Sequence, residues 1–329
     1  MRRWLLIGLS FGGSAFLLWL VLRGVPLAEV VDGIRQADPF WLLINVVLVM
    51  GTLWTRGIRW AGLLDNRVPS RDAFFVMSIS MMLNQLPLRA GEVARSAITL
   101  RYNVPFFTSL TSILIERILD LLAVVIVIGL ALPFAPGATP EAGQAAFGLG
   151  GLALVSFIGL LFFARWPNIP RGILDQLTRW LPLLGKLPLR RFLDHILDGL
   201  QPLMNPRRLA HVLVWTVIAW AVSMGALYAL TRALDIPADK QWVTTLLGVS
   251  FTAIGLALPL SVASLGPFQA ALAFVGTLTL LDPVQAVTLG FLFNGMAVLG
   301  YVLWGTLGLF VLGLSLGGVF QQPQPQQAA

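Results

Sequence analysis

The feature that most constrains this chain is a series of apolar runs, several of which approach or exceed the roughly 20 residues that cross a bilayer as a helix. A soluble helical bundle shows a charged face on each helix, and most of these runs show none. We therefore predict an all-α integral membrane protein with about six full transmembrane helices. The runs are residues 4–22, 39–55, 106–133, 145–164, 209–231 and 284–316.

Basic clusters between the runs predict the orientation of the chain. Of its 22 basic residues, 20 are arginine, and cytoplasmic loops carry such clusters under the positive-inside rule. Residues 165–208 hold basic residues, whereas the loop 134–144 has no lysine or arginine. We expect a multi-pass protein of the inner membrane with a cytoplasmic N-terminus. The predicted cytoplasmic clusters are Arg2 and Arg3, and a loop after the second helix with Arg56, Arg59, Arg67 and Arg71.

One transmembrane domain is expected over residues 1–320. The first apolar run is long for a signal peptide and has no small-residue cleavage site after it, so it is interpreted as a retained helix. Residues 171–205 repeat apolar side chains at helical spacing, which predicts an amphipathic segment on the cytoplasmic membrane surface. The glutamine- and proline-rich end, 321–329, is expected to be disordered.

Two segments are interrupted where a full crossing would need continuous helix. Residues 72–104 contain Pro87, and residues 243–281 contain Pro259 and a run of small residues. Both are predicted to be broken, re-entrant hairpins, which are tolerated where protein or a cavity surrounds them. Each hairpin lies between two spanning helices, and the two open to opposite sides, which favours an inverted repeat. The alternative is that the two breaks are unrelated packing irregularities.

Ionisable residues deep in the long helix 106–133 need an explanation. Glu116 lies roughly 15 Å from the helix start and Asp120 roughly 21 Å, on one face. Such groups are costly in lipid and mark functional sites by default. The hairpin offers partners, because three residues spaced three apart form a stripe there: Arg89, Glu92 and Arg95.

This charged stripe predicts a headgroup site. Pro87 and Gly91 mark a helix start, whose free N–H groups attract anions. Arginine matches the geometry of phosphate, which makes Arg89, Arg95 and Arg117 candidate contacts for a phospholipid headgroup. Glu92, Glu116 and Asp120 then form a charge network that positions the arginines or takes up protons. The alternative is a purely structural salt network, although buried ion pairs seldom stabilise more than apolar packing does.

Several other functions find no support in the sequence. The absence of cysteine excludes thiol catalysis and Cys-ligated metals, and His195 and His211 are the chain's two histidines. No Walker-type, HExxH or GxSxG sequence occurs. No basic soluble domain is present to bind nucleic acid. We therefore expect no metal, no cofactor and no catalytic residue, and hence a protein that is not an enzyme.

Two motifs resemble the flippase-like membrane family, which includes the transmembrane region of lysylphosphatidylglycerol synthases and stand-alone relatives. "LPLRAGEVAR" (86–95) and "SILIERILDLLAV" (112–124) are similar to the family's PGRxGE…R and LERxxDLL. Asn84 stands where the family often has asparagine, which adds it to the headgroup candidates. The resemblance covers nearly the whole chain.

The second family signature, PxSPGGLGxxE, resembles "LPLSVASLGPFQAAL" (258–272). Val262, Ala263 and Ser264 replace Pro-Gly-Gly, and Gln269 replaces the glutamate, so a carboxylate function is not expected at this hairpin. The matching or aligned positions counted as site candidates here are Pro259, Ser261, Gly266 and Gln269.

The resemblance implies translocation of a lipid or a part in making or distributing membrane lipids. We expect a flippase that moves an anionic phospholipid between leaflets without an ATP site of its own. Two alternatives stay open: a membrane enzyme acting on a lipid-linked phosphate or sugar, with Glu116 and Asp120 as acid and base, and a scaffold subunit for lipid-synthesis enzymes. The expected partners are membrane lipids, with lipid-synthesis enzymes as further candidates.

Overall fold

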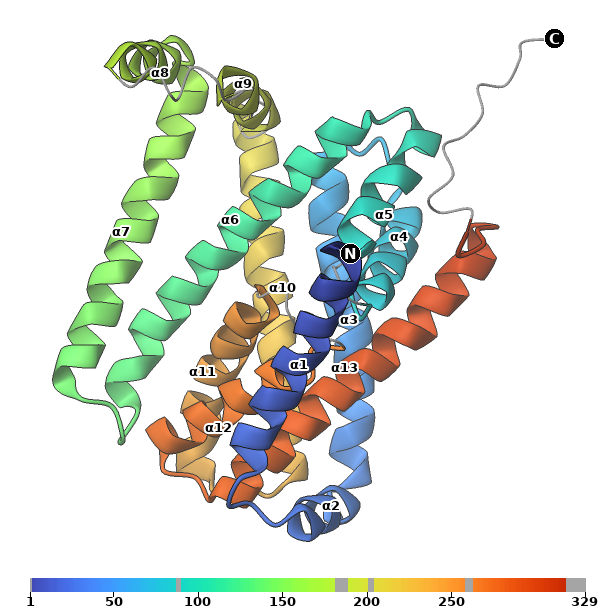
Figure 1. The fold of residues 1–329 in the computed structure, drawn as a ribbon, viewed down its shortest axis with the longest axis vertical. Helices are drawn as coiled ribbons and strands as arrows, with labels where there is room; N and C mark the ends of the chain where they lie inside the picture. Colours follow the sequence, from blue (N-terminus) through green and yellow to red (C-terminus); the bar gives the residue numbers. More distant parts are fainter. Residues whose placement is uncertain (1, 87–89, 181–188, 201–203, 258–262, 318–329) are drawn as a thin grey trace.

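The computed structural model describes residues 2–86, 90–180, 189–200, 204–257 and 263–317, and these residues form helices and connections without a strand (Figure 1). The all-α prediction is confirmed. The α-helices are α1 Arg2–Leu22, α2 Leu27–Gln36, α3 Pro39–Leu63, α4 Ser70–Leu83, α5 Ala90–Ile98, α6 Phe106–Ala131, α7 Pro140–Arg165, α8 Asn168–Trp180, α9 Leu189–Leu200, α10 Pro206–Ala233, α11 Ala238–Ala257, α12 Pro267–Thr279 and α13 Pro283–Val311, with the 3-10 turns η2 Thr99–Tyr102 and η3 Leu132–Phe134.

Four described helices are long and apolar enough to cross a membrane: α3, α7, α10 and α13. A fifth span results if α1 and α2, which meet at an 87° bend, are counted together. Helix α6 has the length of a span, 26 residues, but carries three charged side chains in its first half and middle. The multi-pass class is thus confirmed, while the count of six spans stays a prediction.

The long helices share a start signal that is readable in the sequence. A capping residue accepts a hydrogen bond from an early helical N–H, and proline occupies the first helical position, where it has no N–H to leave unpaired. The N-terminus predicted at Pro39 is confirmed. The pairs are Asp38-Pro39 in α3, Thr139-Pro140 in α7, Asn205-Pro206 in α10 and Asp282-Pro283 in α13.

The contacts between helices follow an inverted repeat. In the first unit α3 packs on α4, and α5 packs on α6; in the second, α10 packs on α11, and α12 packs on α13. Between the units, α3 packs on α10, α4 on α13, and α11 on α6. Figure 1 shows α3 and α10 running in opposite directions, and likewise α6 and α13. Each contact in one unit therefore has a counterpart in the other, which supports the predicted repeat.

The first hairpin is made of helices too short to cross, whereas in the second α12 has 13 residues and α11 has 20. Helix α4 has 14 residues and α5 has 9, which give roughly 21 and 14 Å. In Figure 1, α4 and α5 lie together toward one end of the molecule, whereas α11 and α12 lie toward the other. The Tyr102 hydroxyl donates to Asp72 Oδ2 over 3.0 Å and links the two ends of the first hairpin. Burial and this hydrogen bond raise the pKa of Tyr102 to about 12.

One expected boundary is wrong in a way that matters for the site. The predicted loop after residue 55 is helix, because α3 continues to Leu63. Arg56 and Arg59 therefore belong to α3. The amphipathic segment expected at 171–205 forms α8 and α9, which lie across the end of α7 and α10 (Figure 1). The predicted tail, 321–329, is outside the described residues.

A close approach of α4 and α5 requires the glycine in the first hairpin. A Cβ on Gly91 would lie 1.9 Å from the Ser80 carbonyl oxygen and 2.7 Å from Asn84 Oδ1. The Ser80 hydroxyl donates to the Gly91 carbonyl oxygen over 2.9 Å. The space that the sequence suggested for an anion at Gly91 is thus filled by α4, and this part of the headgroup prediction is wrong.

We expect the variant Gly91→Ala to lower the thermal stability of the purified protein, since overpacking of a tight contact costs about 1–3 kcal/mol or more. Gly148→Ala in α7 is the matched control, because nothing lies within 4 Å of its added Cβ, and alanine is favoured over glycine in a helix by about 0.5–1 kcal/mol. Melting curves in detergent measure both. Equal melting of Gly91→Ala and wild type would contradict the close approach.

Candidate functional site

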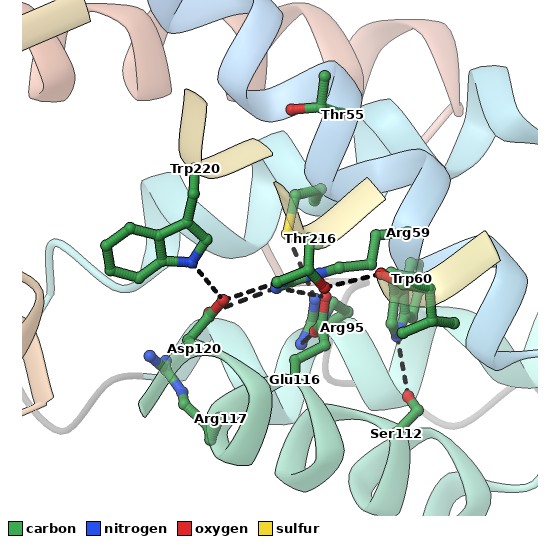
Figure 2. Close-up of polar contacts among 12 residues, drawn as sticks. Thr55, Arg59, Trp60, Arg95, Ser112, Glu116, Arg117, Asp120, Thr216 and Trp220 are labelled. Atoms are coloured by element: carbon green, nitrogen blue, oxygen red, sulfur yellow. Dashed lines mark hydrogen bonds and ion pairs between the residues drawn. The ribbon is translucent and has the colours of Figure 1, made fainter. Parts of the chain in front are cut away.

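A buried cluster of two arginines and two carboxylates joins α3, α5 and α6 (Figure 2). We call Arg59, Arg95, Glu116 and Asp120 the ion-pair cluster. Arg59 donates from Nη1 to Asp120 Oδ1 over 2.7 Å and from Nη2 to Glu116 Oε1 over 3.4 Å. Arg95 Nη2 donates to the other oxygen of Glu116 over 2.6 Å. Glu116 therefore accepts from two helices at once.

The charges of the ion-pair cluster cancel, which explains how they are tolerated in a membrane-spanning bundle. Arg59, Arg95 and Glu116 are buried, and Asp120 is largely so. An isolated charge in such surroundings is costly, whereas hydrogen-bonded opposite charges offset most of that cost. Two atoms stay without a hydrogen-bond partner in the described residues, the Nε atoms of Arg59 and Arg95.

Two tryptophans hold the ion-pair cluster in place. The ring of Trp60 lies under the Arg95 guanidinium, 4.9 Å from its central carbon, and its Nε1 donates to Ser112 Oγ over 2.9 Å. Such stacking adds a cation–π attraction to the ion pair. Trp220, from α10, donates to Asp120 Oδ1 over 3.3 Å. The cluster thereby contacts the first helix of the second repeat unit as well.

A second, more accessible ion pair lies beside the cluster, between Arg117 on α6 and Glu92 on α5. The Arg117 side chain is 36% exposed and the Glu92 side chain 27% exposed. A ligand can therefore reach both. The structure thus brings together most of the predicted charged residues. Arg95 pairs with Glu116, and Arg117 pairs with Glu92. Asp120 is linked to Glu116 because Arg59 pairs with both carboxylates. Arg89 lies outside the described residues.

Arg59 is the site residue that the sequence interpretation missed. It was counted with the cytoplasmic loop because two arginines follow the apolar run of α3. The available signal was the apolar sequence after them, since Trp60, Leu63 and Leu64 continue the helical pattern and are all buried. An arginine flanked by such residues on a helix is better explained as a buried ion-pair partner.

The amide side chains at the first break do not join the ion-pair cluster. Asn84 is the last residue before the break and caps α4, and its Oδ1 is buried without a hydrogen-bond partner in the described residues. The Oε1 of its neighbour Gln85 is in the same situation. Both acceptors therefore lack a donor, and Asn84 stays a predicted contact.

At the second break, the described residues are joined by polar contacts that involve no charged side chain. The buried Gln269 accepts from the Gly266 N–H over 2.8 Å and so caps α12, a contact that the family's usual glutamate can make equally well. Asn294 of α13 donates to the Ala263 carbonyl over 3.0 Å. Pro259 and Ser261 lie outside the described residues.

The residues that replace the family's glycines carry backbone strain. Ala263 and Ser264 have φ values of 49° and 55°, and Gly266 has 93°. Only glycine adopts such conformations freely, and other residues bear a cost of about 1–3 kcal/mol there. The hydrogen bond from Asn294 holds the Ala263 peptide in this conformation.

Residues next to the two breaks contact each other. The N–H of Ala263 donates to the carbonyl oxygen of Gln85 over 2.9 Å. One hairpin thus pairs with the other through backbone groups that neither helix can satisfy internally. This is the arrangement in which transporters with inverted repeats place their substrate sites. In the part of the chain that the structure describes, no three His, Asp or Glu side chains form a group suited to a metal.

The fold and the site together define a polytopic helical membrane protein with two broken hairpins and a buried ion-pair cluster. The family described as the lysylphosphatidylglycerol synthase transmembrane region matches residues 5–305. The chain belongs to this family, and the recognition from the sequence motifs is confirmed.

A glycosyltransferase, AglD, of Haloferax volcanii is 23% identical to the chain. The match includes 88% of this chain and 51% of that protein, so the chain spans about half the length of this relative. No solved structure matches the chain significantly.

We expect Glu116→Gln to destabilise the protein by about 3–5 kcal/mol, because it leaves two buried guanidinium groups short of one negative charge. Glu141→Gln is the control, since Glu141 is exposed in the first turn of α7, where such changes stay within about 0.5 kcal/mol. Thermal melting in detergent is the measurement. If the two variants melt alike, the ion-pair cluster does not hold the hairpin.

Proposed function

We propose that this protein translocates an anionic phospholipid between the leaflets of an inner membrane, with its N-terminus in the cytoplasm and no ATP site of its own. The observation that carries the proposal is the ion-pair cluster, which attaches the arm α5 of a broken hairpin to the long helices α3 and α6. Membership of the lysylphosphatidylglycerol synthase transmembrane-region family, whose description names a phospholipid, supports the proposal of a lipid substrate.

The accessible pair Arg117–Glu92 is the proposed first contact for the headgroup. A phosphate can replace Glu92 at the Arg117 guanidinium, because both are oxyanions and bind arginine in the same geometry. The half-exposed state of this pair supports such an exchange. Arg89 and Asn84, at the same hairpin, are proposed as further contacts.

The buried charges have a different part in the proposal. Arg95 is buried, stacks on Trp60 and pairs with Glu116. In the proposal it therefore holds α5 in place. Its predicted direct contact with the headgroup requires the hairpin to move first. Glu116 and Asp120 balance the two arginines. Protonation of Glu116 weakens the attachment of the hairpin arm α5 to α6, and protonation of Asp120 weakens the link between α6 and α3. This links lipid movement to proton uptake.

In liposomes that carry a fluorescent anionic phospholipid, we expect the wild-type protein to speed up transbilayer movement relative to protein-free vesicles. Arg117→Ala removes the accessible cation and should slow that movement about tenfold. The measurement is the fraction of fluorophore that an impermeant reductant quenches over time.

Arg117→Lys is the conservative control, which keeps the charge but loses the forked geometry and should fall between the two. Folding of each variant is checked by its melting curve before reconstitution. Movement at the protein-free rate in wild-type vesicles would refute the translocase proposal. Movement at the wild-type rate in Arg117→Ala would remove Arg117 from the site.

A membrane enzyme that acts on a lipid-linked phosphate or sugar is the second candidate. The observation that favours it is the likeness to a protein named as a glycosyltransferase, although this chain covers 51% of that protein. Glu116 and Asp120 are the carboxylates available for acid–base chemistry, and both are occupied by Arg59. That engagement argues for translocation over catalysis.

Mass spectrometry separates the two candidates. Total membrane lipids incubated with the purified protein should keep their masses if the protein is a translocase. A new lipid mass that appears with the wild type and not with Asp120→Asn would establish the enzymatic alternative instead.

A further inference from the structure

A cavity of about 70 Å³ lies between the two repeat units. Residues of α3, α10, α11, α12 and α13 line it. One wall is Trp220, whose ring nitrogen donates to Asp120 of the ion-pair cluster. A single water needs about 10–15 Å³ measured in this way, so the cavity is large enough for a group the size of a phosphate. Through Trp220, the cavity adjoins the ion-pair cluster.

Arg56 is the charged residue among those that line this cavity. It is half-buried and lies one turn before Arg59 on α3. Within the described residues, Arg56 forms no ion pair and no side-chain hydrogen bond, in contrast to Arg59 and Arg95. A guanidinium that cannot lose its proton is costly inside a membrane bundle unless an anion accompanies it.

The ion-pair cluster accounts for the unpaired state of Arg56. Both oxygens of Asp120 are taken by Arg59, at 2.7 and 3.3 Å. Since the four charges of the cluster cancel, the charge of Arg56 is left over. The cavity thus offers one positive charge to whatever enters it.

The remaining polar groups of the wall indicate what else the ligand carries. The hydroxyls of Thr52, Ser223 and Thr252 each donate to a carbonyl of their own helix, at 3.0, 2.8 and 2.7 Å. Their hydrogens are used, so they present lone pairs to the cavity. Tyr301 also lines the cavity, and its hydroxyl forms no hydrogen bond with the described residues. Arg56 and Tyr301 are therefore the donors for an anion, and the three hydroxyls are acceptors for donor groups.

We propose that Arg56 binds the phosphodiester of a lipid headgroup that bears its own hydroxyl or ammonium donors, within the cavity between the repeat units. One arginine matches the single negative charge of a phosphodiester, and Tyr301 donates a further hydrogen bond. The hydroxyls of Thr52, Ser223 and Thr252 accept from the polyol or amine part of the headgroup. The assignment to a lipid rests on the proposed translocation, with Arg117 as the entry contact and Arg56 as the central one.

Equilibrium binding of short-chain phosphatidylglycerol to the purified full chain in detergent tests the proposal. Arg56→Gln should weaken this binding about tenfold or more, and Arg56→Lys should lose less. Arg35→Gln is the control, because the Arg35 side chain is 77% exposed on α2; its binding should equal the wild type. Without lipid, Arg56→Gln should melt at or above the wild-type temperature, since it removes an uncompensated charge.

Two further arms identify the source of the anion. Inorganic phosphate should bind at least tenfold more weakly than phosphatidylglycerol, because it lacks the acyl chains and the polyol. Short-chain diacylglycerol, which has no phosphate, should bind equally to wild type and to Arg56→Gln. Phosphatidylglycerol affinity that is unchanged in Arg56→Gln overturns the proposal, and so does inorganic phosphate that binds as tightly as the lipid.

The outcome is distinguishable from failure of the translocase proposal. Arg56-dependent lipid binding by a protein that moves no lipid in vesicles supports this site and refutes translocation. Lipid movement that persists at the wild-type rate in Arg56→Gln, together with unchanged binding, supports translocation and refutes this site.

Discussion

The carboxylate of Glu116, held between the guanidinium groups of Arg59 and Arg95, is the interaction on which the first half of the molecule depends. Helix α5 is only 9 residues long and cannot anchor itself in a bilayer. Its arginine supplies the anchor by reaching Glu116 on α6, which Arg59 ties in turn to α3. Removal of Arg59, Arg95 or Glu116 leaves an unbalanced charge in the apolar interior. The three helices are therefore held together as a unit. Trp60, which is fully buried, stacks on the Arg95 guanidinium of this contact.

In the second half of the molecule, amide side chains hold the broken hairpin in place. Gln269 caps α12, and Asn294 holds the Ala263 peptide, so the described residues of the second break are joined by neutral hydrogen bonds and no ion pair. The repeat is therefore similar in its helix contacts and different in its chemistry. One half has a firm charged attachment, and the other has a strained turn held by neutral hydrogen bonds. Between them lies a cavity whose one charged lining residue is Arg56.

Much of the candidate site could be predicted from the sequence, because helical spacing decides which residues share a face. Glu116 and Asp120 were placed on one face and near Arg95 on that basis, and the structure brings these side chains together. Arg59 could not be obtained in this way, since its partner Asp120 is 61 positions further along the chain. Gly91 was misinterpreted for a similar reason: the atoms that fill its surroundings belong to Ser80 and Asn84, on another helix.

By itself, the sequence determined the class of the protein, the helix start at Asp38-Pro39 and the two segments that are interrupted at a proline. These follow from local physics: burial of apolar runs in lipid, proline's missing N–H and the conformational freedom of glycine. Only the tertiary structure decided which charges cancel and which is left over. Arg56 and Arg59 are three residues apart on the same helix. Arg59 is paired with Asp120, whereas Arg56 lines a cavity. That difference depends on how α6 and α10 pack against α3, and it cannot be predicted from the spacing of residues within α3.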